Sequence, residues 1–546
     1  MASGAMTPGA NPTIARHGAP PATVAAASRW QSFTHGLAWS AFGVILLLAA
    51  LAPIARTGDA HQYYAMATAL AELRPPALTA GEVDRFKAWL HAQPAAANFA
   101  VAAKAVDQPP LIVDGRQEFS HFWLYPLLVA PIIALTTTID LHPGYAFLVI
   151  NSMLLGLALW ITQRAFSPVV SLLLLASPVI WFVNKAQVEV FTFSLLAIAM
   201  AYARRGRFLG AGLTAAIAST QNAPILAAVA CLWAVGIARQ MVRRQPVALK
   251  WQGSALVILT LIVGALHPAY YLWRLGVLTP QRLNGGIDLG FPTLHPYFAV
   301  LIDLDIGLLP WMPLFGVAAA IGLVLLVKAP RASQSRGERD KLPRDWGLVG
   351  HPAVEDLNLR LAAACGLLIG AWFLFVFAQT SNLNSGGTVH ISRYALWLMP
   401  LALPLVAATA GWLHPRVPAL LPVAGLFAVI AYGAYFLPSR AEQYMTYSPQ
   451  AAFIMSRAPE LYRPLPEIFY ERHHHTDGGV LGSVASSDCR VILLHAAAPD
   501  IACPLSADET IVANRLLAGD WQAIWIIRPG PLGLGPGRVT GALAQP

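Results

Sequence analysis

Charged residues are scarce in this chain of 546 residues. Asp, Glu, Lys and Arg make up 12% of it, whereas roughly a quarter of an ordinary soluble domain is charged. This deficit, together with 56% hydrophobic residues, excludes a cytosolic enzyme. Many apolar runs approach the roughly 20 residues that cross a bilayer as a helix. The sequence therefore predicts an all-α polytopic membrane protein.

Cysteine is also rare, and its four residues are too few for a disulfide scaffold. Cys231 and Cys365 lie in apolar runs, whereas Cys489 and Cys503 share the polar C-terminal segment, where one bridge between them is a hypothesis. The chain has no P-loop, Gly-rich dinucleotide turn, serine nucleophile elbow or zinc signature. ATP-driven transport by this chain is therefore not expected. The net charge of +9 is attributed to cytoplasmic loops rather than to a nucleic-acid partner.

Eleven apolar runs are expected to cross the membrane. They span 35–55, 144–163, 165–183, 187–203, 208–220, 223–239, 252–272, 306–328, 360–379, 394–412 and 417–437. With the N-terminus in the cytoplasm, this count leaves most basic residues of the short loops inside, as the charge bias of membrane proteins requires. A further run, 121–139, is assigned to the outer interface, because a crossing there would invert every later loop. The short runs 208–220 and 223–239 suggest a cavity that opens outside.

These runs divide the chain into three parts. Residues 1–34 are expected to be a disordered cytoplasmic tail, and 35–437 a transmembrane domain. That domain contains a long first extracytosolic loop, 56–143, with interfacial helices, and a cytoplasmic loop, 329–358. In 438–546, short apolar stretches alternate with Gly, Pro and Asp, which predicts a small extracytosolic α/β domain.

Polar residues near the ends of the apolar runs lie almost entirely on the expected outer side. An ionisable group at membrane depth costs about 2.5–3.5 kcal/mol, so its presence needs a reason. The set comprises Asp59, His61, Tyr63, Glu118, His121, Asn184, Lys185, Glu189, Gln221, Asn222, Arg274, Arg282, Asp303, Asp305, His390, Arg393 and Tyr394. We therefore expect an outward-facing cavity that contains both carboxylates and cations.

The cations of this set oppose the usual charge bias. Lys185, Arg274, Arg282 and Arg393 could each contact lipid headgroups instead of a ligand. Together they suit an anionic ligand such as a lipid-linked phosphate, because charge-assisted bonds to phosphate are strong. Arg393 is the preferred phosphate ligand, since it follows a small polar run and precedes an apolar helix.

The acidic residues allow two interpretations each. Asp59 follows Gly58 and could cap the next helix, or it could accept a proton from an acceptor hydroxyl, and the two roles can coexist. Glu189 could match a helix dipole or be a second cavity carboxylate. Asp303 and Asp305 have the spacing of a metal-binding pair, but capping is favoured. A solvated loop is favoured over metal binding for the histidines at 473–475, so a divalent metal stays a hypothesis and no cofactor is certain.

Several motifs together point to a known family. They are Gly58-Asp59 with Tyr63 at the start of the first outer loop, the segment HFWLYPLLVAP from His121, NKAQVEVF around Glu189, and the stretches 296–315 and 386–405. Over about 35–440 the arrangement resembles the GT-C superfamily of integral-membrane glycosyltransferases. This superfamily includes protein mannosyltransferases and the enzymes that put aminoarabinose on lipid A.

The resemblance implies inverting transfer of one sugar from a polyprenyl-phosphate donor to a hydroxyl of a glycan, lipid or protein in the cell envelope. The reaction would take place at the outer face of a bacterial-type inner membrane. Asp59 would be the catalytic base, and Arg393, helped by Lys185 or Arg282, would bind the phosphate. Ala60 follows Asp59 where many members have an Asp-Glu pair, which leaves a second acid or metal there in doubt.

Two other functions stay open. An O-antigen ligase or polymerase would also present outward basic residues in a helical bundle, but it would use lipid-diphosphate oligosaccharides. A secondary transporter is less favoured, because the chain has no related halves.

Overall fold

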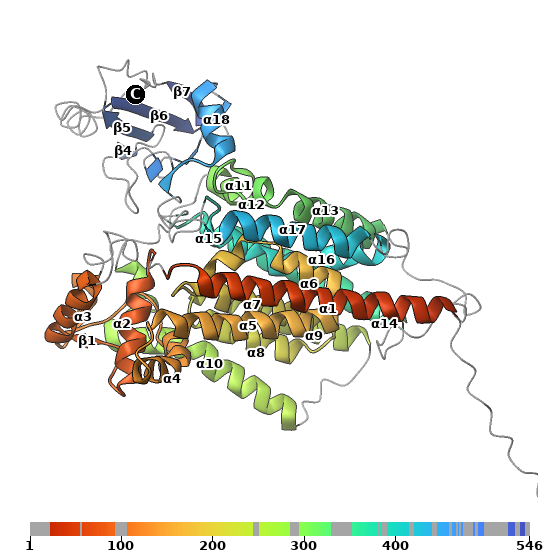
Figure 1. Ribbon diagram of the computed structural model, residues 1–546, viewed down its shortest axis with the longest axis horizontal. Coiled ribbons are helices and arrows are strands. Elements are labelled where there is room, and N and C mark those ends of the chain that lie inside the picture. The colour runs from red at the N-terminus through yellow and green to blue at the C-terminus, as the bar shows by residue number, and fades with distance from the viewer. Residues whose placement is uncertain are drawn as a thin grey trace, which may run out of the picture.

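Helices account for most of the chain in the computed structural model (Figure 1). The structure describes residues 22–54, 57–92, 106–243, 251–283, 294–328, 352–380, 383, 390–413, 420–438, 445–457, 461–462, 464–465, 468, 471–472, 484–485, 490–495, 522–529 and 536–540. The predictions for the first 21 residues, for most of the loop 329–358, for the histidines at 473–475, and for Cys489 and Cys503 concern residues outside these described ranges.

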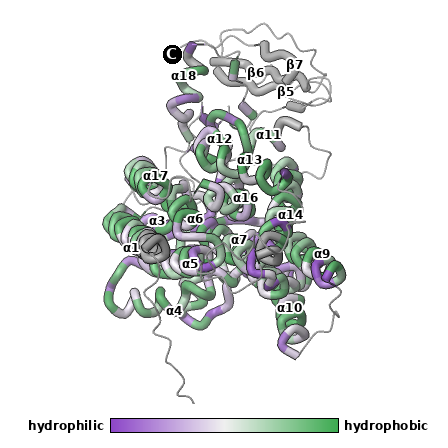
Figure 2. The backbone as a smooth tube through the Cα atoms, turned by 90° about the vertical axis from the view of Figure 1, so that its right-hand side faces the viewer, coloured by the Kyte–Doolittle hydropathy of each residue, from purple (hydrophilic) through white to green (hydrophobic). Residues whose placement is uncertain are grey.

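Within the residues that the structure describes, six helical stretches are long and apolar enough to cross a membrane, as expected for a multi-pass protein. These stretches are Ser32–Leu51, Gly144–Ala165, Ala223–Val242, Trp251–Leu275, Leu357–Phe377 and Arg393–Leu413. They belong to helices α1 (Ala22–Leu51), α5 (Gly144–Ala165), α9 (Leu226–Val242), α10 (Trp251–Leu275), α14 (Pro352–Phe377), α15 (Arg393–Leu396) and α16 (Leu398–Leu413). Hydrophobic residues cover the outward faces of peripheral helices such as α1 (Figure 2), which is the pattern that lipid contact requires.

Shorter elements complete the bundle. They are α6 (Pro168–Leu175), η4 (Pro178–Asn184), α7 (Glu189–Arg204), α8 (Phe208–Ser219), η5 (Ala223–Ile225), η6 (Pro280–Arg282), α11 (Leu294–Ile302), α12 (Leu308–Trp311), α13 (Pro313–Lys328) and α17 (Leu420–Phe436). Helix α7 packs against α5, α8, α14 and α16 and is buried along almost its whole length. It is therefore the central helix, and Glu189 is its first residue.

Two expected helices are broken beside a proline, which explains each of these breaks. The run 165–183 is divided into α6 and η4 because Pro178 lacks a backbone N–H and disfavours the helical conformation of Ser177. The run 306–328 begins late, at Leu308, and is interrupted at Met312, which precedes Pro313. Helix α1, in contrast, begins at Ala22 rather than at residue 35. Residues 22–34 were expected to be disordered, but they are rich in alanine, which has a high helix propensity.

One end of the bundle, called here the site end, carries the elements between α1 and α5. These are α2 (Ala60–Ala71), β1 (Leu78–Thr79), α3 (Ala80–Ala92), η3 (Pro109–Leu111), β2 (Ile112–Val113), β3 (Arg116–Gln117) and α4 (Leu124–Thr138). The strands form a small antiparallel sheet in the order β1-β3-β2. In Figure 1, α2 runs across the bundle rather than along it.

In the chain after α17, the described helix and strands lie toward the same end (Figure 1). This part of the chain contains α18 (Pro449–Arg457) and the strands β4 (Val484–Ala485), β5 (Arg490–His495), β6 (Gln522–Pro529) and β7 (Pro536–Thr540). These strands form an antiparallel sheet in sequence order. Strands β5 and β6 lie in short apolar stretches of the sequence, whereas the small α/β domain stays a prediction.

Glycine allows α16 to approach its neighbours closely. A Cβ atom added at Gly322 of α13 would overlap the backbone of Leu405, and one added at Gly366 of α14 would overlap the backbone of Leu401. Small residues at such contacts let membrane helices pack backbone against backbone. Since α16 continues from α15, this packing also fixes the position of α15, whose first residue is Arg393.

Candidate functional site

Asp59 lies at the site end, in the turn between α1 and α2. Gly58 has a φ of 49°, in the left-handed region that favours glycine, and it turns the chain from α1 into α2. The side-chain amide of Gln187 holds this turn by donating to the carbonyl oxygen of Thr57 at 2.8 Å. Asp59 occupies the N-cap position of α2, but its side chain makes no capping hydrogen bond. Its carboxylate is therefore available to other groups.

Those groups come from distant parts of the chain. Arg393, the first residue of α15, donates from Nη1 to Asp59 Oδ2 at 3.0 Å. His121 Nε2 lies 3.1 Å from the same oxygen. The Asp59 side chain keeps 24% of its surface exposed, whereas that of Arg393 keeps 7%. The carboxylate thus lies at the edge of the site, and the guanidinium lies beneath it.

A second carboxylate approaches the same guanidinium from the central helix. Glu189 has no exposed surface, and its Oε1 lies 3.6 Å from Arg393 Nη1. Arg393 Nη2 also donates to the Tyr394 hydroxyl at 3.3 Å. We refer to Asp59, His121, Glu189, Arg393 and Tyr394 as the Asp59–Arg393 cluster. It joins α2, the segment before α4, α7 and α15.

The charges of this cluster set the acidity of Asp59. Burial alone would raise the pKa of its carboxyl, but His121 and then Arg393 outweigh burial and lower the pKa well below its ordinary value. Asp59 is therefore ionised at neutral pH. While it is paired with Arg393 it is a weak base, and withdrawal of the guanidinium toward another anion would strengthen it.

Tyr63 and His61 line the same region. The Tyr63 ring lies 4.9 Å from the His121 ring and is fully buried, while His61 Nδ1 lies 3.1 Å from the Gly58 carbonyl oxygen. The segment before α4 is fixed by Gln62, whose Oε1 accepts hydrogen bonds from the backbone and hydroxyl of Ser120. Helix α2 therefore positions both Asp59 and the chain that carries His121.

Glu118 and Arg274 form a separate pair near this segment. Arg274 Nε donates to Glu118 Oε1 at 2.6 Å, and the Tyr270 hydroxyl donates to Oε2 at 2.7 Å. Arg274 Nη1 also lies 3.3 Å from Asp114. The guanidinium of Arg274 thus has protein carboxylates as partners, and the pair attaches the C-terminal end of α10 to the segment that leads to His121.

Asn184, the last residue of η4, and Lys185, which follows it, are both buried. Lys185 Nζ donates to Asn184 Oδ1 at 2.6 Å and lies 5.0 Å from the Trp181 ring centre. Asn151 of α5 donates to the carbonyl oxygen of Lys185 at 3.0 Å. This buried amide holds the backbone of the turn that precedes Glu189.

The other predicted residues of this end lie apart from these groups. Gln221 is fully buried at the turn between α8 and η5, and Asn222 beside it is half-buried. The neighbouring Thr220 carbonyl oxygen lies 2.8 Å from His267 Nδ1. Arg282 is exposed at the end of η6. Among the described residues, Arg282 has no ion pair with the Asp59–Arg393 cluster.

Asp303 and Asp305 organise the loop between α11 and α12. Asp303 Oδ1 accepts hydrogen bonds from the backbone of Asp305 and Ile306 at 2.8 and 3.0 Å, which closes a turn within the loop. The N-cap of α12 is Gly307, so Asp303 does not cap this helix as the sequence predicted. It also accepts from the Tyr462 hydroxyl at 2.9 Å. Asp305 Oδ2 pairs with Arg472 Nε at 2.7 Å. The two carboxylates therefore bind the chain that follows α17.

His390 connects this loop to Arg393. Its φ of 68° is unusual for a residue with a side chain. The His390 ring is stacked on Trp311, with centres 5.3 Å apart, and its Nδ1 lies 4.0 Å from Asp305 Oδ1. The Ser392 backbone donates to the Ile306 carbonyl oxygen at 3.0 Å. The α11–α12 loop thus determines where α15 begins.

Within the described ranges, no group of three or more His, Cys, Asp or Glu residues could hold a metal ion. Tyr270, Tyr462 and Arg472 hold the acidic residues in place but are not predicted from the sequence. Arg472 lies in the mixed stretch FYERHHH, which gives no periodic signal. Asn151 could have been found, because a lone amide within an apolar run needs a partner.

No protein-family model matches the chain, and no curated protein matches it.

Proposed function

We propose that this chain is a membrane glycosyltransferase of the GT-C type. It moves one sugar from a polyprenyl-phosphate donor to a hydroxyl of an envelope glycan, lipid or protein, with inversion. The contact that carries the proposal is the 3.0 Å ion pair between Asp59 and Arg393. These residues were assigned separately as base and phosphate ligand, and the reaction requires both beside the same sugar carbon.

The burial of the cluster supports this division of roles. Asp59 has the exposed edge that an acceptor hydroxyl needs for access, whereas Arg393 and Glu189 are buried. A guanidinium held by two carboxylates is oriented before substrate binds, which favours stabilisation of developing negative charge. The other basic residues, Lys185, Arg274 and Arg282, have a lesser part in the proposal. Arg274, for example, already pairs with Glu118.

The proposed reaction has one substitution step. The acceptor oxygen forms a bond to the anomeric carbon of the sugar while the bond from that carbon to the phosphate oxygen breaks. The acceptor proton goes to Asp59, and the electron pair of the broken bond stays on the leaving polyprenyl phosphate. Arg393 moves part of its interaction from Asp59 to this phosphate. The pKa of Asp59 rises as that guanidinium withdraws, so the carboxylate becomes a stronger base when donor is bound.

The proposal includes an orientation in a bacterial-type inner membrane. The N-terminus is cytoplasmic, and the site end faces the extracytosolic side together with the chain after α17. Helix α4 lies in the outer interface, which suits its exposed Leu127, Leu128 and Leu135. Eleven crossings, including the shorter α7, α8, α13 and α17, complete this topology, and the prenyl chain lies between helices.

Membranes that contain wild type or Asp59→Asn provide the test. They are incubated with a panel of labelled polyprenyl-monophosphate sugars, and both sugar transfer and free polyprenyl phosphate are measured. We expect wild type to consume one donor and Asp59→Asn to lose at least about a hundredfold in transfer rate, as removal of a general base does. Asp84→Asn is the matched control, because Asp84 is an exposed acid of α3 outside the cluster.

Retention of activity within a few-fold in folded Asp59→Asn would show that this carboxylate is not the base. If folded wild type consumes none of the monophosphate donors, the proposed reaction is wrong. Consumption of lipid-diphosphate oligosaccharides would then support a ligase or polymerase, and ion-coupled uptake would support a transporter.

A further inference from the structure

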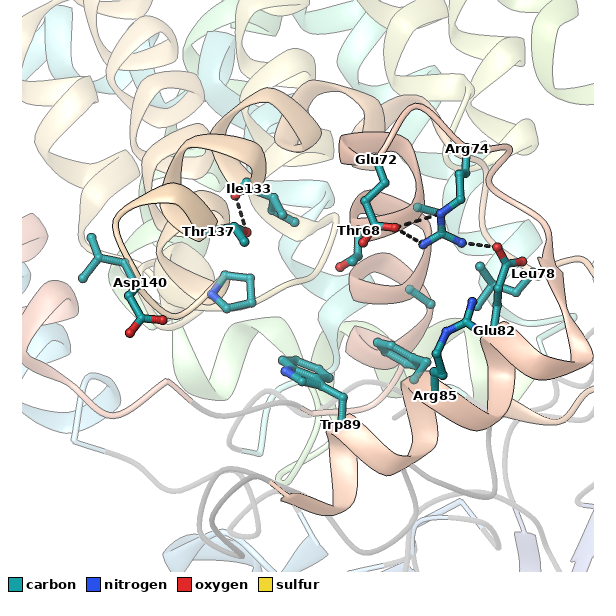
Figure 3. A pocket seen from close by; sticks show the side chains of 15 residues that line it. Thr68, Glu72, Arg74, Leu78, Glu82, Arg85, Trp89, Ile133, Thr137 and Asp140 are labelled. Atoms are coloured by element: carbon teal, nitrogen blue, oxygen red, sulfur yellow. Dashed lines mark hydrogen bonds and ion pairs between the residues drawn. The ribbon is translucent and has the colours of Figure 1, made fainter.

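A pocket of about 510 Å³ lies at the site end (Figure 3). No residue of the Asp59–Arg393 cluster lines it. Its walls come from α2, α3, the α2–α3 connection and the C-terminal part of α4 with the turn after it. Helix α2 contributes Ala65, Thr68 and Ala69, and its C-cap residue Glu72 follows them. Their spacing of three and four residues places them on one helix face. The volume is in the range of small-molecule sites.

The pocket and the cluster share α2 but use different parts of it. Tyr63, which contacts His121, and Ala65, which lines the pocket, are two residues apart and so point to different sides of the helix. Ala65 is six residues after Asp59, so the backbone positions of the two residues are about 9 Å apart along the helix axis. A ligand that extends over several units could occupy both places at once.

Aromatic rings form one wall. Phe86 and Trp89 of α3 are stacked, with ring centres 5.6 Å apart and planes at 24°. In Figure 3, Trp89 extends from α3 toward the pocket. Its ring also lies 5.8 Å from that of Tyr64 and 6.2 Å from that of His142. Trp89 is thus held in place before a ligand binds and offers a flat apolar surface at a low entropic cost.

Carboxylates and hydroxyls form the rim. Arg74 is held between Glu72, at 2.8 Å from its Nε, and Glu82, so its charge is neutralised within the protein. Glu82 also accepts from the Thr79 backbone at 2.7 Å. Glu72 and Asp140 are exposed, and their oxygens can accept hydrogen bonds from a ligand. With Arg85, the ionised groups of the lining sum to about one negative charge, so a phosphate would not be favoured.

A flat apolar wall beside a rim of hydrogen-bond acceptors fits one class of ligand. A neutral sugar ring has a face of C–H groups, which can lie on Trp89, and hydroxyls at its edge, which can donate to Glu72 and Asp140. An acyl chain would gain nothing from these carboxylates and would leave them poorly solvated. The charged and aromatic lining therefore selects a sugar over a lipid tail.

We propose that this pocket binds a neutral sugar unit of the acceptor glycan. The assignment to the acceptor rests on the proposed function, in which the single sugar of the donor must lie beside Asp59 and Arg393 and cannot reach the pocket. The pocket then selects acceptors that extend beyond the reacting unit, and α2 sets the distance between this unit and the base.

Direct binding tests the pocket without reference to catalysis. Purified full-length protein in lipid nanodiscs is titrated with maltose, cellobiose and a mannose disaccharide, and saturation-transfer NMR reports which sugar protons contact the protein. We expect millimolar or tighter binding to wild type, a loss of about tenfold or more in Trp89→Leu, and little change in Trp89→Phe. Trp251→Leu is the matched control, because Trp251 is 82% exposed on α10.

Each result is decisive for the pocket. Equal binding by Trp89→Leu and wild type would overturn the proposal, and so would absence of binding by every disaccharide up to about 10 mM, a concentration that would detect even weak sites. Asp140→Asn gives a second, milder variant, since asparagine tolerates the positive φ of 58° at this position. It should weaken sugar binding severalfold without a change in the thermal unfolding midpoint, and unchanged binding would remove Asp140 from the site.

The transfer assay separates this inference from the proposed function. If both hold, Trp89→Leu raises the acceptor KM about tenfold and leaves donor KM unchanged. If sugars bind at Trp89 but wild type transfers no sugar from any donor, the proposed function fails and the pocket remains. If transfer occurs with the same acceptor KM in Trp89→Leu, the proposed function stands and the acceptor assignment is wrong.

Discussion

Glu189 holds a carboxylate with no exposed surface at the end of the central helix. Among the described residues, Glu189 forms its ion pair with Arg393. A buried charge that loses its partner keeps its desolvation cost without compensation, whereas neutralising both partners removes most of that cost. The two residues should therefore depend on each other in stability, whatever reaction the site performs.

Arg393→Gln should lower the free energy of unfolding by about 3–5 kcal/mol, because it leaves Glu189 unpaired in the interior. Glu189→Gln added to it should recover most of that loss. Chemical denaturation of the two single variants and the double variant in the same detergent gives the coupling between the residues. Additive losses in the double variant would contradict an interaction between Glu189 and Arg393.

Single residues of the site could be predicted, but their contact could not. Asp59 and Arg393 were expected separately, because each is an ionisable group at the end of an apolar run. They are 334 residues apart, and charge patterns specify the side of the membrane rather than which helix ends meet. The partners of Glu118 and Asp305 were missed for the same reason. Tyr270 and Arg472 are ordinary residues until tertiary packing brings them to a carboxylate.

At the scale of helices, hydropathy predicted where the helices lie in the sequence better than it predicted whether each helix is continuous. The runs 144–163, 208–220 and 252–272 correspond to α5, α8 and α10 with small shifts at their ends. The breaks before Pro178 and Pro313 were missed, because an apolar run shows no change in hydropathy where a proline interrupts its hydrogen bonds. Local backbone chemistry, rather than apolar length, therefore decides where those helices end.

Close helix contacts give a prediction for α14. Gly366→Ala should destabilise the protein by about 1–3 kcal/mol, because its added methyl group meets the Leu401 backbone, which cannot move aside as a flexible side chain can. Gly370→Ala, one turn further along the same helix, has open space at its Cβ. It should be neutral or slightly stabilising, since alanine favours helix.

Thermal unfolding midpoints of both variants in one lipid nanodisc preparation provide the comparison. Equal midpoints for Gly366→Ala and wild type would show that α14 and α16 are not in backbone contact at this position.

At the scale of the molecule, the α11–α12 loop joins the bundle to the chain that follows α17. Asp305 binds Arg472 and the backbone of Ser448, while Ile306 binds Ser392 beside Arg393. The position of Arg393 is therefore linked to the attachment of the C-terminal segment. Two titratable groups of this junction, Asp303 and His390, have pKa values shifted in opposite directions.

Their effects on stability oppose each other. Burial, and then Asp305, raise the pKa of Asp303 to about 6 from an ordinary 3.8. The folded state thus binds more protons between these values, and stability from Asp303 is lost as pH rises through about 6. Burial lowers the pKa of His390 to about 4 from an ordinary 6.5, although Asp305 opposes the shift. Stability from His390 is therefore present above 6.5 and lost as pH falls through about 4.

The two opposite pH dependences of stability should nearly cancel in wild type between pH 4 and 6. A variant that lacks one of the two groups should therefore show the pH dependence that comes from the other group. Asp303→Asn keeps an oxygen for its three hydrogen bonds, so the remaining His390 makes stability rise with pH by up to about 1.4 kcal/mol per unit. His390→Asn, which tolerates the φ of 68°, should leave a slope of opposite sign. Unfolding midpoints measured across this window, each expressed relative to wild type, remove the effects of all other titrating groups. Parallel curves for the three proteins would mean that neither side chain titrates abnormally at this junction, whereas slopes of opposite sign would establish that Asp303 and His390 balance each other where the C-terminal segment meets the bundle.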